Sequence, residues 1–321
     1  MRKLTNLLAA LCLLLFVSCH AEKEYYVFTS FHEPADAGLR YLVSRDGRHW
    51  DSIPGTWLKP ALGQHKLMRD PSIARTPDGT YHLVWTTSWK GDVGFGHATS
   101  RDLIHWSEQE MIPVMAHEPT TVNVWAPEIF YDDAKEELMV VWASCIPGRF
   151  AKGIEEENNN HRLYYITTKD FKTISETKLL YDPGFSSIDA TIVKRAPEDY
   201  VMVLKDNTRP ERNLRVAFAS SAQGPYHDLS GPFTESFVEG PTIEKIGEEF
   251  LVYFDVYKKK IYGAVRTKDF RSFTDETNRI TLPHGHKHGT IFRAPEALVE
   301  ELMRSSHSKV STGNVRNESI K

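Results

Sequence analysis

A strand–turn–strand unit occurs four times along the chain and limits the folds open to it. In each unit, an acidic or proline residue precedes the start of an apolar run by 11 residues. The pairs are Asp70 and Tyr81, Pro127 and Leu138, Asp189 and Tyr200, and Glu239 and Phe250. Both halves of each unit are rich in Val, Ile, Tyr, Phe and Trp, which predicts strands. Turn residues such as Pro77-Asp78-Gly79 separate them.

A second marker follows each unit and sets the length of the repeat. It is a Ser or Thr, a basic residue and an Asp, as in Ser100-Arg101-Asp102 before His105-Trp106, and Ser221-Ala222-Gln223 is a looser version. Successive units begin 49 to 62 residues apart, at Asp70, Pro127, Asp189, Glu239 and His288. Repeats of this length, with about four short strands each, predict an all-β fold, a five-bladed β-propeller.

The fifth repeat is divided between the two ends of the chain. An inner strand follows His288, but residues 295–303 have the character of a helix. The missing outer strands are found at residues 24–29, 39–44 and 50–53. We therefore expect the N- and C-terminal strands to share one blade and close the ring. The propeller domain is predicted over residues 25–303, and the polar stretch 304–321 is expected to be a disordered tail.

The first 19 residues have the character of an export signal. Arg2 and Lys3 precede an apolar run over residues 7–17, which is too short to span a membrane. The run ends in Ser18-Cys19 and resembles a bacterial lipoprotein lipobox, with Phe16 where Leu is usual. The prediction is a signal peptide over 1–19, a lipidated Cys19 and a linker over 20–24. The protein would then be a membrane-anchored lipoprotein, periplasmic or on the cell surface; the alternative is simple cleavage to a soluble exported protein.

The composition limits the kinds of partner that the protein can bind. The 321 residues include 39 basic and 43 acidic side chains, so the net charge of −4 provides no basic excess for nucleic-acid binding. Aromatic residues make up 11%, which favours β-structure and flat surfaces on which a ligand can stack. We expect a monomer. Cys145 lies in an apolar run and is expected in the core.

Three acidic residues are expected to meet at the propeller axis. The innermost strand of every blade lines the central channel, so Asp70, Asp189 and Glu239 should face one cavity. Like charges and burial both raise carboxyl pKa values, and a cost of this kind marks candidate functional sites. Glycoside hydrolysis by inversion uses such carboxyl groups: one activates water, and another, about 6.5–9.5 Å away, protonates the leaving oxygen.

Four short segments carry a resemblance to a known family: Arg69-Asp70-Pro71, Trp125-Ala126-Pro127-Glu128, Ile188-Asp189-Ala190 and Glu239-Gly240-Pro241. With them, residues 25–293 resemble glycoside hydrolase family 43, five-bladed propellers that act on arabinofuranosides, xylosides and related sugars. The resemblance implies that Asp70 is the general base and Glu239 the general acid. It also implies that Asp189 orients Glu239 and keeps its pKa high. The implied substrate is an oligo- or polysaccharide of plant type, from which terminal or side-chain furanosyl or xylosyl residues, above all α-L-arabinofuranosyl, are removed.

Further residues are candidates for substrate contacts: Arg69, Trp89, Trp125, Glu128, Lys205 and Arg209. The two tryptophans offer faces for stacking on a sugar, with core packing as the alternative. Lys205 and Arg209 follow a strand and are candidates for binding hydroxyl groups, with an exposed loop as the alternative.

The resemblance also bears on metals. Family members often place a histidine at the position of His288, near a calcium ion or a water-filled centre. We therefore expect no required cofactor, and a structural Ca²⁺ at the axis near His288 is a hypothesis. No His/Cys/Asp cluster has the spacing of a zinc site.

Two other functions stay open. One is a glycan-binding propeller without catalysis, although none of the three acids is replaced by an amide. The other is a retaining furanosidase from a related propeller family. Those enzymes carry a nucleophile in an Asn-Asp-Pro setting, and here Arg69 stands in place of that Asn.

Overall fold

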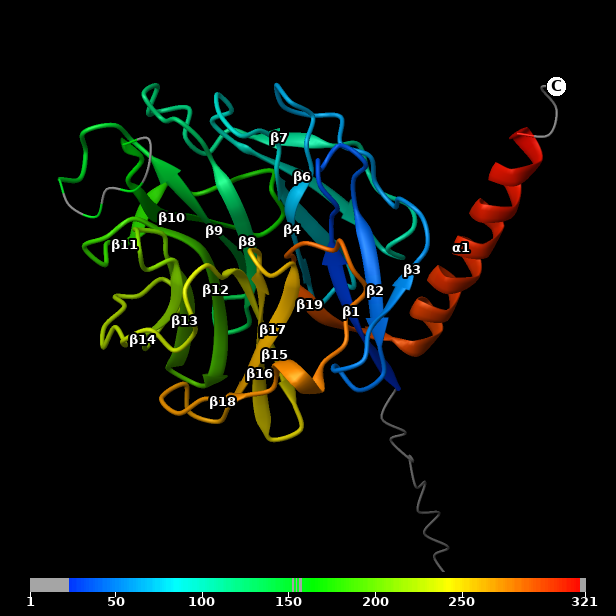
Figure 1. Cartoon of the computed structure of the whole chain (residues 1–321). Helices are drawn as coiled ribbons and strands as arrows, with labels where there is room; N and C mark the ends of the chain where they lie inside the picture. Colours follow the sequence, from blue (N-terminus) through cyan, green and yellow to red (C-terminus); the bar gives the residue numbers. More distant parts are fainter. Residues whose placement is uncertain (1–22, 152, 154, 156–157, 318–321) are drawn as a thin grey trace, which may run out of the picture.

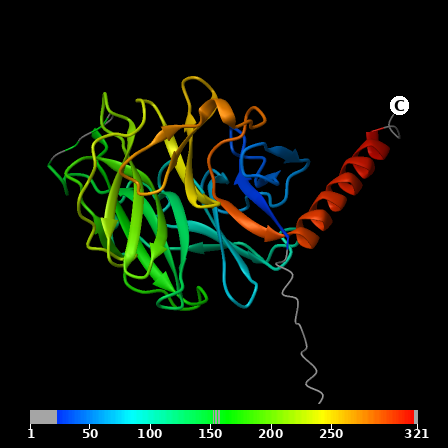
Figure 2. The same cartoon turned by 90° about the horizontal axis from the view of Figure 1, so that it is seen from below.

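Five small sheets are arranged in a ring around a central axis, which confirms the predicted five-bladed propeller (Figures 1 and 2). The computed structural model describes residues 23–151, 153, 155 and 158–317. The predicted signal peptide and Cys19 therefore lie outside the described residues. Among the described helices, none has the length and apolar character needed to cross a membrane.

Blades 1, 2 and 4 each hold four antiparallel strands in chain order. Blade 1 contains β4 (Arg69–Arg75), β5 (Tyr81–Thr86), β6 (Phe95–Ser100) and β7 (Glu110–Ile112). Blade 2 contains β8 (Trp125–Asp132), β9 (Glu137–Cys145), β10 (His161–Thr168) and β11 (Lys178–Tyr181). Blade 4 contains β15 (Glu239–Ile246), β16 (Glu249–Val256), β17 (Ile261–Thr267) and β18 (Thr274–Asp275).

Blades 3 and 5 depart from this pattern. Blade 3 has three strands, β12 (Ser187–Ala196), β13 (Asp199–Asp206) and β14 (Asn213–Ala219). A single bridge between Phe218 and His227 stands where a fourth strand would pair. Blade 5 contains β19 (Ile291–Pro295), β1 (Glu24–Ser30), β2 (Arg40–Ser44) and β3 (Asp51–Ile53), with η2 (Thr277–Arg279) on the path into it.

Blade 5 closes the ring, as the divided repeat predicts. Strand β19 pairs with β1 in an antiparallel register that runs from Glu24 opposite Pro295 to Phe28 opposite Ile291. The inner strands then follow one another around the axis, with β4 against β8, β8 against β12, β12 against β15, and β15 against β19. The inner strands of all five blades therefore surround one axis.

The Ser/Thr-x-Asp markers are turns that end the third strand of a blade. In blade 1, Ser100 Oγ accepts the N–H of Leu103 at 2.9 Å, and Asp102 Oδ1 accepts the N–H of His105 at 2.8 Å. The same bonds recur in blade 4, from Phe270 N–H to Thr267 Oγ1 and from Ser272 N–H to Asp269 Oδ1. These side chains satisfy backbone N–H groups that leave the sheet, which explains why the marker recurs.

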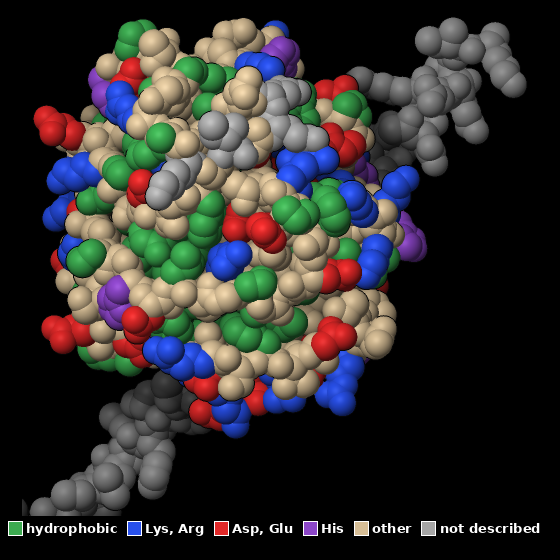
Figure 3. Space-filling model, turned by 60° about the vertical axis from the view of Figure 1, so that its left-hand side comes forward, with side chains coloured by type: hydrophobic (Ala, Val, Ile, Leu, Met, Phe, Trp, Pro, Cys, Tyr) green, Lys and Arg blue, Asp and Glu red, His purple; other side chains and the backbone are tan. Residues whose placement is uncertain are grey.

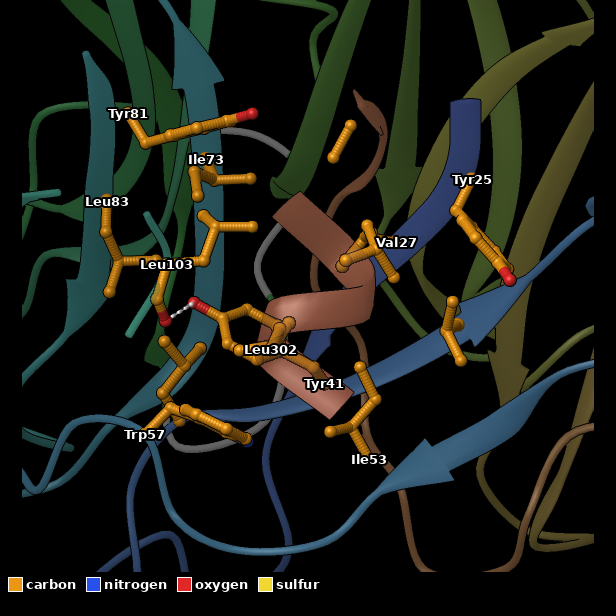
Figure 4. Close-up of a cluster of buried hydrophobic side chains, with 14 of the residues drawn as sticks. Tyr25, Val27, Tyr41, Ile53, Trp57, Ile73, Tyr81, Leu83, Leu103 and Leu302 are labelled. Atoms are coloured by element: carbon orange, nitrogen blue, oxygen red, sulfur yellow. Dashed lines mark hydrogen bonds between the residues drawn. The ribbon is translucent and has the colours of Figure 1, made fainter. Parts of the chain in front are cut away.

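Apolar side chains fill the seams between blades. One cluster joins blade 5 to blade 1, and Figure 4 shows Tyr41 pointing into it with its hydroxyl donating to the carbonyl of Leu103 at 3.3 Å. Helix α1 (Glu296–Asn317) adds Val299 and Leu302 to this cluster. Cys145 is buried, as expected.

Helix α1 corrects the predicted C-terminal boundary. The helix continues past Met303 to Asn317, so the expected disordered tail is helical over most of its length. The sequence contains neither Pro nor Gly between Glu296 and Thr312, so nothing in it ends the helix at Met303. Arg304 pairs with Glu301 one turn earlier at 2.8 Å. The helix leaves the propeller beside blade 5 and points away from it (Figures 1 and 2).

Candidate active site

The three predicted acids line one cavity at the propeller axis. The cavity has a volume of about 580 Å³ and is lined by Asp70 of blade 1, Asp189 of blade 3 and Glu239 of blade 4. Both aspartates are 8% exposed. Propeller geometry thus brings together residues that lie up to 169 positions apart in the sequence. The face shown in Figure 3 carries acidic and basic side chains interspersed with small apolar groups.

A β-bulge at the start of the inner strand aims these side chains. The pairing register shifts there in each of blades 1 to 4. One residue of each bulge has a positive φ: Asp70 (54°), Ala126 (47°), Asp189 (51°) and Gly240 (57°). Bulges bend a strand and redirect a side chain, and they are frequent beside active sites. The left-handed backbone of Asp70 and Asp189 is uncommon outside glycine, so its local strain must be held by the surrounding structure.

The bulges also correct the predicted equivalence of the three acids. Asp70 and Asp189 occupy the bulge position itself, whereas in blade 4 that position is Gly240 and Glu239 precedes it. The spacing of 11 residues is the same in all four units, but the β15–β16 hairpin has a different pairing register. The spacing therefore did not reveal this shift. A side chain at Gly240 would collide with the imidazole of His288, so this bulge requires glycine.

Asp70 is held by groups from blades 1 and 5. Its Oδ2 accepts the Thr86 hydroxyl at 2.8 Å, and its Oδ1 forms an ion pair with Nε2 of His288. The same Thr86 oxygen accepts the N–H of Ala126 at 2.8 Å, which ties blade 1 to blade 2. Burial alone would raise the pKa of Asp70, but the charges of His288 and Arg69 outweigh it and lower the pKa to about 2. Asp70 is therefore ionised at neutral pH.

His288 lies at the axis as an imidazolium. Burial would lower its pKa, but the carboxylates of Asp70, Asp189 and Glu239 raise it to about 9. A protonated imidazole has no lone pair to offer a metal ion. The described residues also contain no group of three or more His, Cys, Asp or Glu side chains arranged to hold one. A structural Ca²⁺ at the axis near His288 stays a prediction.

Asp189 and Glu239 differ from the predicted relationship. Asp189 Oδ2 accepts the N–H of Gly240 at 3.1 Å, next to Glu239, so it is placed to orient that segment. Burial raises the pKa of Asp189 despite the nearby cations of His288 and Lys205. Burial would also raise the pKa of Glu239, but Lys205 and His288 outweigh it and the pKa is lowered. The nearer charge is the Lys205 cation, so the pKa of Glu239 is lowered and is not kept high by Asp189 as expected.

Aromatic and basic side chains form one wall of the cavity. Trp89 is 46% exposed, and the guanidinium of Arg69 lies 4.0 Å from the centre of its ring. Arg69 also pairs with Glu33 at 2.5 Å. The indole N–H of Trp125 donates to the carbonyl of Trp89 at 3.0 Å, and its ring stacks on His161 with centroids 4.8 Å apart. Arg69, Trp89, Trp125 and Lys205 all line the cavity, as predicted.

Two predicted substrate contacts lie elsewhere. Glu128 follows the bulge of β8 and lines a separate cavity of about 20 Å³ on the axis. Arg209 is not among the residues that line the active-site cavity; Asn207 and Arg212 from the same loop are. The position of Arg209 just after a strand indicated the loop that reaches the cavity. The conformation of that loop decides which of its side chains turns inward.

The sequence prediction missed Glu155 altogether. This residue comes from the long loop after β9 and lines the cavity together with Asn159. Its carboxylate contacts the side chains of His161 and Asn207 and accepts the Ser186 hydroxyl at 2.6 Å. The run of glutamates and asparagines in this loop was the only signal, and such a run usually indicates a solvated loop.

Comparison with known families agrees with this geometry. Residues 22–297 match a family related to glycoside hydrolase family 43 and described as "Probable glycosyl hydrolase domain". The chain belongs to this family. The match spans the propeller, so all five blades and the three acids fall within the family 43-related domain. No curated protein matches the chain by sequence.

Solved structures share the fold at low sequence identity. An α-L-arabinanase from Cellvibrio cellulosa is 13% identical, with 81% of this chain and 95% of that chain covered and a TM-score of 0.56. A thermostable family-43 glycoside hydrolase is 14% identical, with 69% and 78% covered and a TM-score of 0.54. An α-L-arabinofuranosidase from Lactobacillus brevis is 16% identical, with 65% and 72% covered and a TM-score of 0.51. Similarity at these identities places this family 43-related chain among the propellers and does not identify its sugar.

Proposed function

We propose that this protein hydrolyses glycosides by inversion and removes terminal or side-chain furanosyl or xylosyl residues, with α-L-arabinofuranosides of plant-type glycans as its substrates. One observation carries the proposal: Asp70, Asp189 and Glu239 line a single cavity of about 580 Å³. That volume lies within the range of cavities that enclose small ligands. Its lining also supplies exposed Trp89 for stacking and charged Arg69 and Lys205 for hydroxyl groups.

Asp70 has the properties of the general base. A base must be ionised before it takes a proton from water, and the pKa of Asp70 is lowered to about 2 by the cations around it. Thr86 and His288 each hold one carboxylate oxygen, so the orientation of the group is fixed. Water bound beside Asp70 would attack the anomeric carbon from one face of the sugar.

Glu239 serves as the general acid, and its environment predicts the pH range in which the enzyme is active. An inverting enzyme needs this carboxyl protonated when the leaving oxygen departs. Because Lys205 lowers the pKa of Glu239, the protonated form is populated on the acidic side of neutrality. We therefore expect an acidic pH optimum, with Asp189 orienting the segment through the N–H of Gly240.

One observation favours a second candidate, a propeller that binds glycans without cleaving them. Glu239 is ion-paired with Lys205 at 3.0 Å, an arrangement that favours its ionised form. A binding protein needs no proton there, and the aromatic wall of Trp89 and Trp125 would serve it equally well.

A proton NMR time course on nitrophenyl glycosides distinguishes these functions. The α-L-arabinofuranoside is tested first, and the xyloside and galactofuranoside follow. Appearance of the inverted anomer before mutarotation supports the proposal. Appearance of the retained anomer points to the related retaining furanosidases instead. Calorimetric binding of arabino- or xylo-oligosaccharides without turnover of any glycoside would establish the binding propeller.

We further propose that the protein is exported, anchored through lipidated Cys19 and active as a monomer. The apolar run before Ser18-Cys19 supports this location. Incorporation of labelled palmitate into the wild type but not into a Cys19→Ala variant would support it, and equal labelling of both would refute it.

A further inference from the structure

Glu128 does not line the active-site cavity, yet it lies close to Asp70 and Asp189. It lines the axial cavity of about 20 Å³ together with Asp70, Asp189 and His288. A cavity of this size has room for about one water molecule and not for a sugar. A carboxylate at this place therefore needs an explanation other than substrate contact.

The partners of Glu128 come from blades 1, 3 and 5. Its Oε1 accepts the hydroxyl of Thr191 from blade 3 at 3.1 Å. Its Oε2 lies 3.2 Å from the hydroxyl of Thr290, at the start of blade 5. The Thr290 hydroxyl also lies 2.7 Å from Ser72 Oγ of blade 1. That Ser72 oxygen accepts the N–H of Ile129 from β8 at 3.0 Å, so the connections return to blade 2.

Each hydroxyl in this network follows a residue of the active site by two positions. Ser72 follows Asp70, Thr191 follows Asp189, and Thr290 follows His288. Asp70 and Asp189 sit on strained bulges with positive φ, so their aim depends on what holds the strand immediately after the bulge. The Glu128 network connects the three segments two positions after these active-site residues.

The energetic cost of Glu128 supports a specific role. Burial raises its pKa to about 7, although the hydroxyls of Ser72, Thr191 and Thr290 act in the opposite direction. An apolar side chain of similar size would avoid this cost. Buried polar networks that are satisfied hold a unique arrangement of the groups they join.

We propose that Glu128 is a positioning residue for the hydrolysis, a side chain that fixes the inner strands of blades 1, 3 and 5 so that Asp70, Asp189 and His288 converge. The role rests on the proposed function for its effect on rate, but the placement itself is independent of turnover. Glu128 lines the small axial cavity and not the active-site cavity, so its effect on the reaction passes through the residues it holds.

The test compares Glu128→Leu with Glu128→Gln. Leucine removes every hydrogen bond, whereas glutamine can accept one hydroxyl and donate to another. We expect Glu128→Leu to lower kcat by roughly tenfold to 100-fold, since a 1 Å misplacement can cost about that much, with KM changed less than about threefold. Glu128→Gln should restore most of kcat. Unchanged kcat in Glu128→Leu, or an equal loss in Glu128→Gln, would overturn the proposal.

A matched control separates positioning from general destabilisation. Glu244 is also a glutamate on an inner strand, β15, and its side chain is 15% exposed and paired with Arg293 at 2.9 Å. It lines neither axial cavity. Glu244→Leu should lower the melting temperature while leaving kcat within about twofold. A loss of kcat equal to that of Glu128→Leu would assign both effects to stability.

Crystal structures of the wild type and the two leucine variants provide a readout that needs no turnover. We expect the carboxyl groups of Asp70 and Asp189 to shift relative to each other in Glu128→Leu and to keep their places in Glu244→Leu. If the wild type hydrolyses no glycoside, the proposed function fails while this comparison still decides the role of Glu128. Unmoved carboxyl groups in Glu128→Leu would overturn the positioning role even in an active enzyme.

Discussion

The ammonium of Lys205 lies 3.0 Å from Oε2 of Glu239, and both groups line the cavity at the propeller axis. Because Lys205 is only 1% exposed, water screens the interaction between its charge and Glu239 poorly. Burial would lower the pKa of this lysine, but Glu239 and Asp189 raise it. The pair sets the protonation state of the group on which acid catalysis depends.

Replacement of Lys205 should therefore move the alkaline limb of the pH–rate profile. In Lys205→Met the pKa of Glu239 rises, because the cation that favours its ionised form is gone. Glu239 then keeps its proton to higher pH, so the alkaline limb of kcat/KM should shift upward by about one pH unit or more. Rates measured from pH 3 to 9 provide the check. A limb that stays in place would show that another group controls it.

Removal of either catalytic carboxylate should abolish most turnover in a folded protein. Asp70→Asn cannot accept the proton of water, and Glu239→Gln cannot donate one to the leaving oxygen. General acid or base catalysis contributes about 10²- to 10⁴-fold, and we expect losses in that range. Nitrophenyl glycoside assays, with circular dichroism to confirm folding, test both variants. Full activity in either folded variant would remove that residue from the mechanism.

The Asp70–His288 ion pair predicts how stability depends on pH. The pKa of His288 is raised to about 9 in the folded protein, against about 6.5 in an unfolded chain. The folded state therefore binds more protons than the unfolded state between these values. The stabilisation is complete below pH 6.5 and is lost as pH rises toward 9.

Melting temperatures of the wild type and His288→Gln, measured from pH 6 to 10, test this linkage. The wild type should lose several degrees more than the variant across that interval. The Asp70 carboxylate has the opposite dependence, since its stabilisation is present above about pH 3.9 and is lost as pH falls toward 2. Parallel curves for the two proteins in the alkaline range would contradict the pKa assigned to His288.

Gly240→Ala should damage the site from a position that carries no chemistry. Gly240 has a φ of 57°, and an added Cβ would collide with the ring of His288. A left-handed backbone at alanine costs about 1 kcal/mol, and the collision adds to it. We expect a lower melting temperature together with a loss of kcat.

Gly247→Ala is the control for this variant. Gly247 also has a positive φ of 64°, but no atom lies within 4 Å of an added Cβ. It should lose stability by a similar backbone cost and keep its activity. If Gly240→Ala is no worse than Gly247→Ala, contact with His288 is not what requires the glycine.

The fold could be predicted from sequence because its causes are local and repeated. Each blade is a meander of adjacent strands, and markers such as Ser100-Arg101-Asp102 bind their own backbone. The shared blade at the ends followed from counting strands. The boundary of α1 was missed because polarity over residues 304–317 was taken to mean disorder, although no helix breaker separates Met303 from that stretch.

The site could be predicted only in part because its finer geometry depends on non-local contacts. The positions of Asp70, Asp189 and Glu239 followed from propeller symmetry. The shift of Glu239 by one place came from strand register, and the lowered pKa of its carboxyl came from Lys205 on a neighbouring blade. Spacing in one strand does not reveal which charge approaches from the next blade.

The pairing of β1 with β19 has a consequence for where along the ring the chain can begin and end. The N–H of Glu296 donates to the carbonyl of Lys23 at 2.8 Å, so the two ends of the propeller are neighbours. A short peptide linking them, with new termini opened at the exposed turn after Pro77, would leave all five sheets with their present partners. Such a circular permutant should fold to the same ring, since the architecture has a cyclic order and no intrinsic first blade.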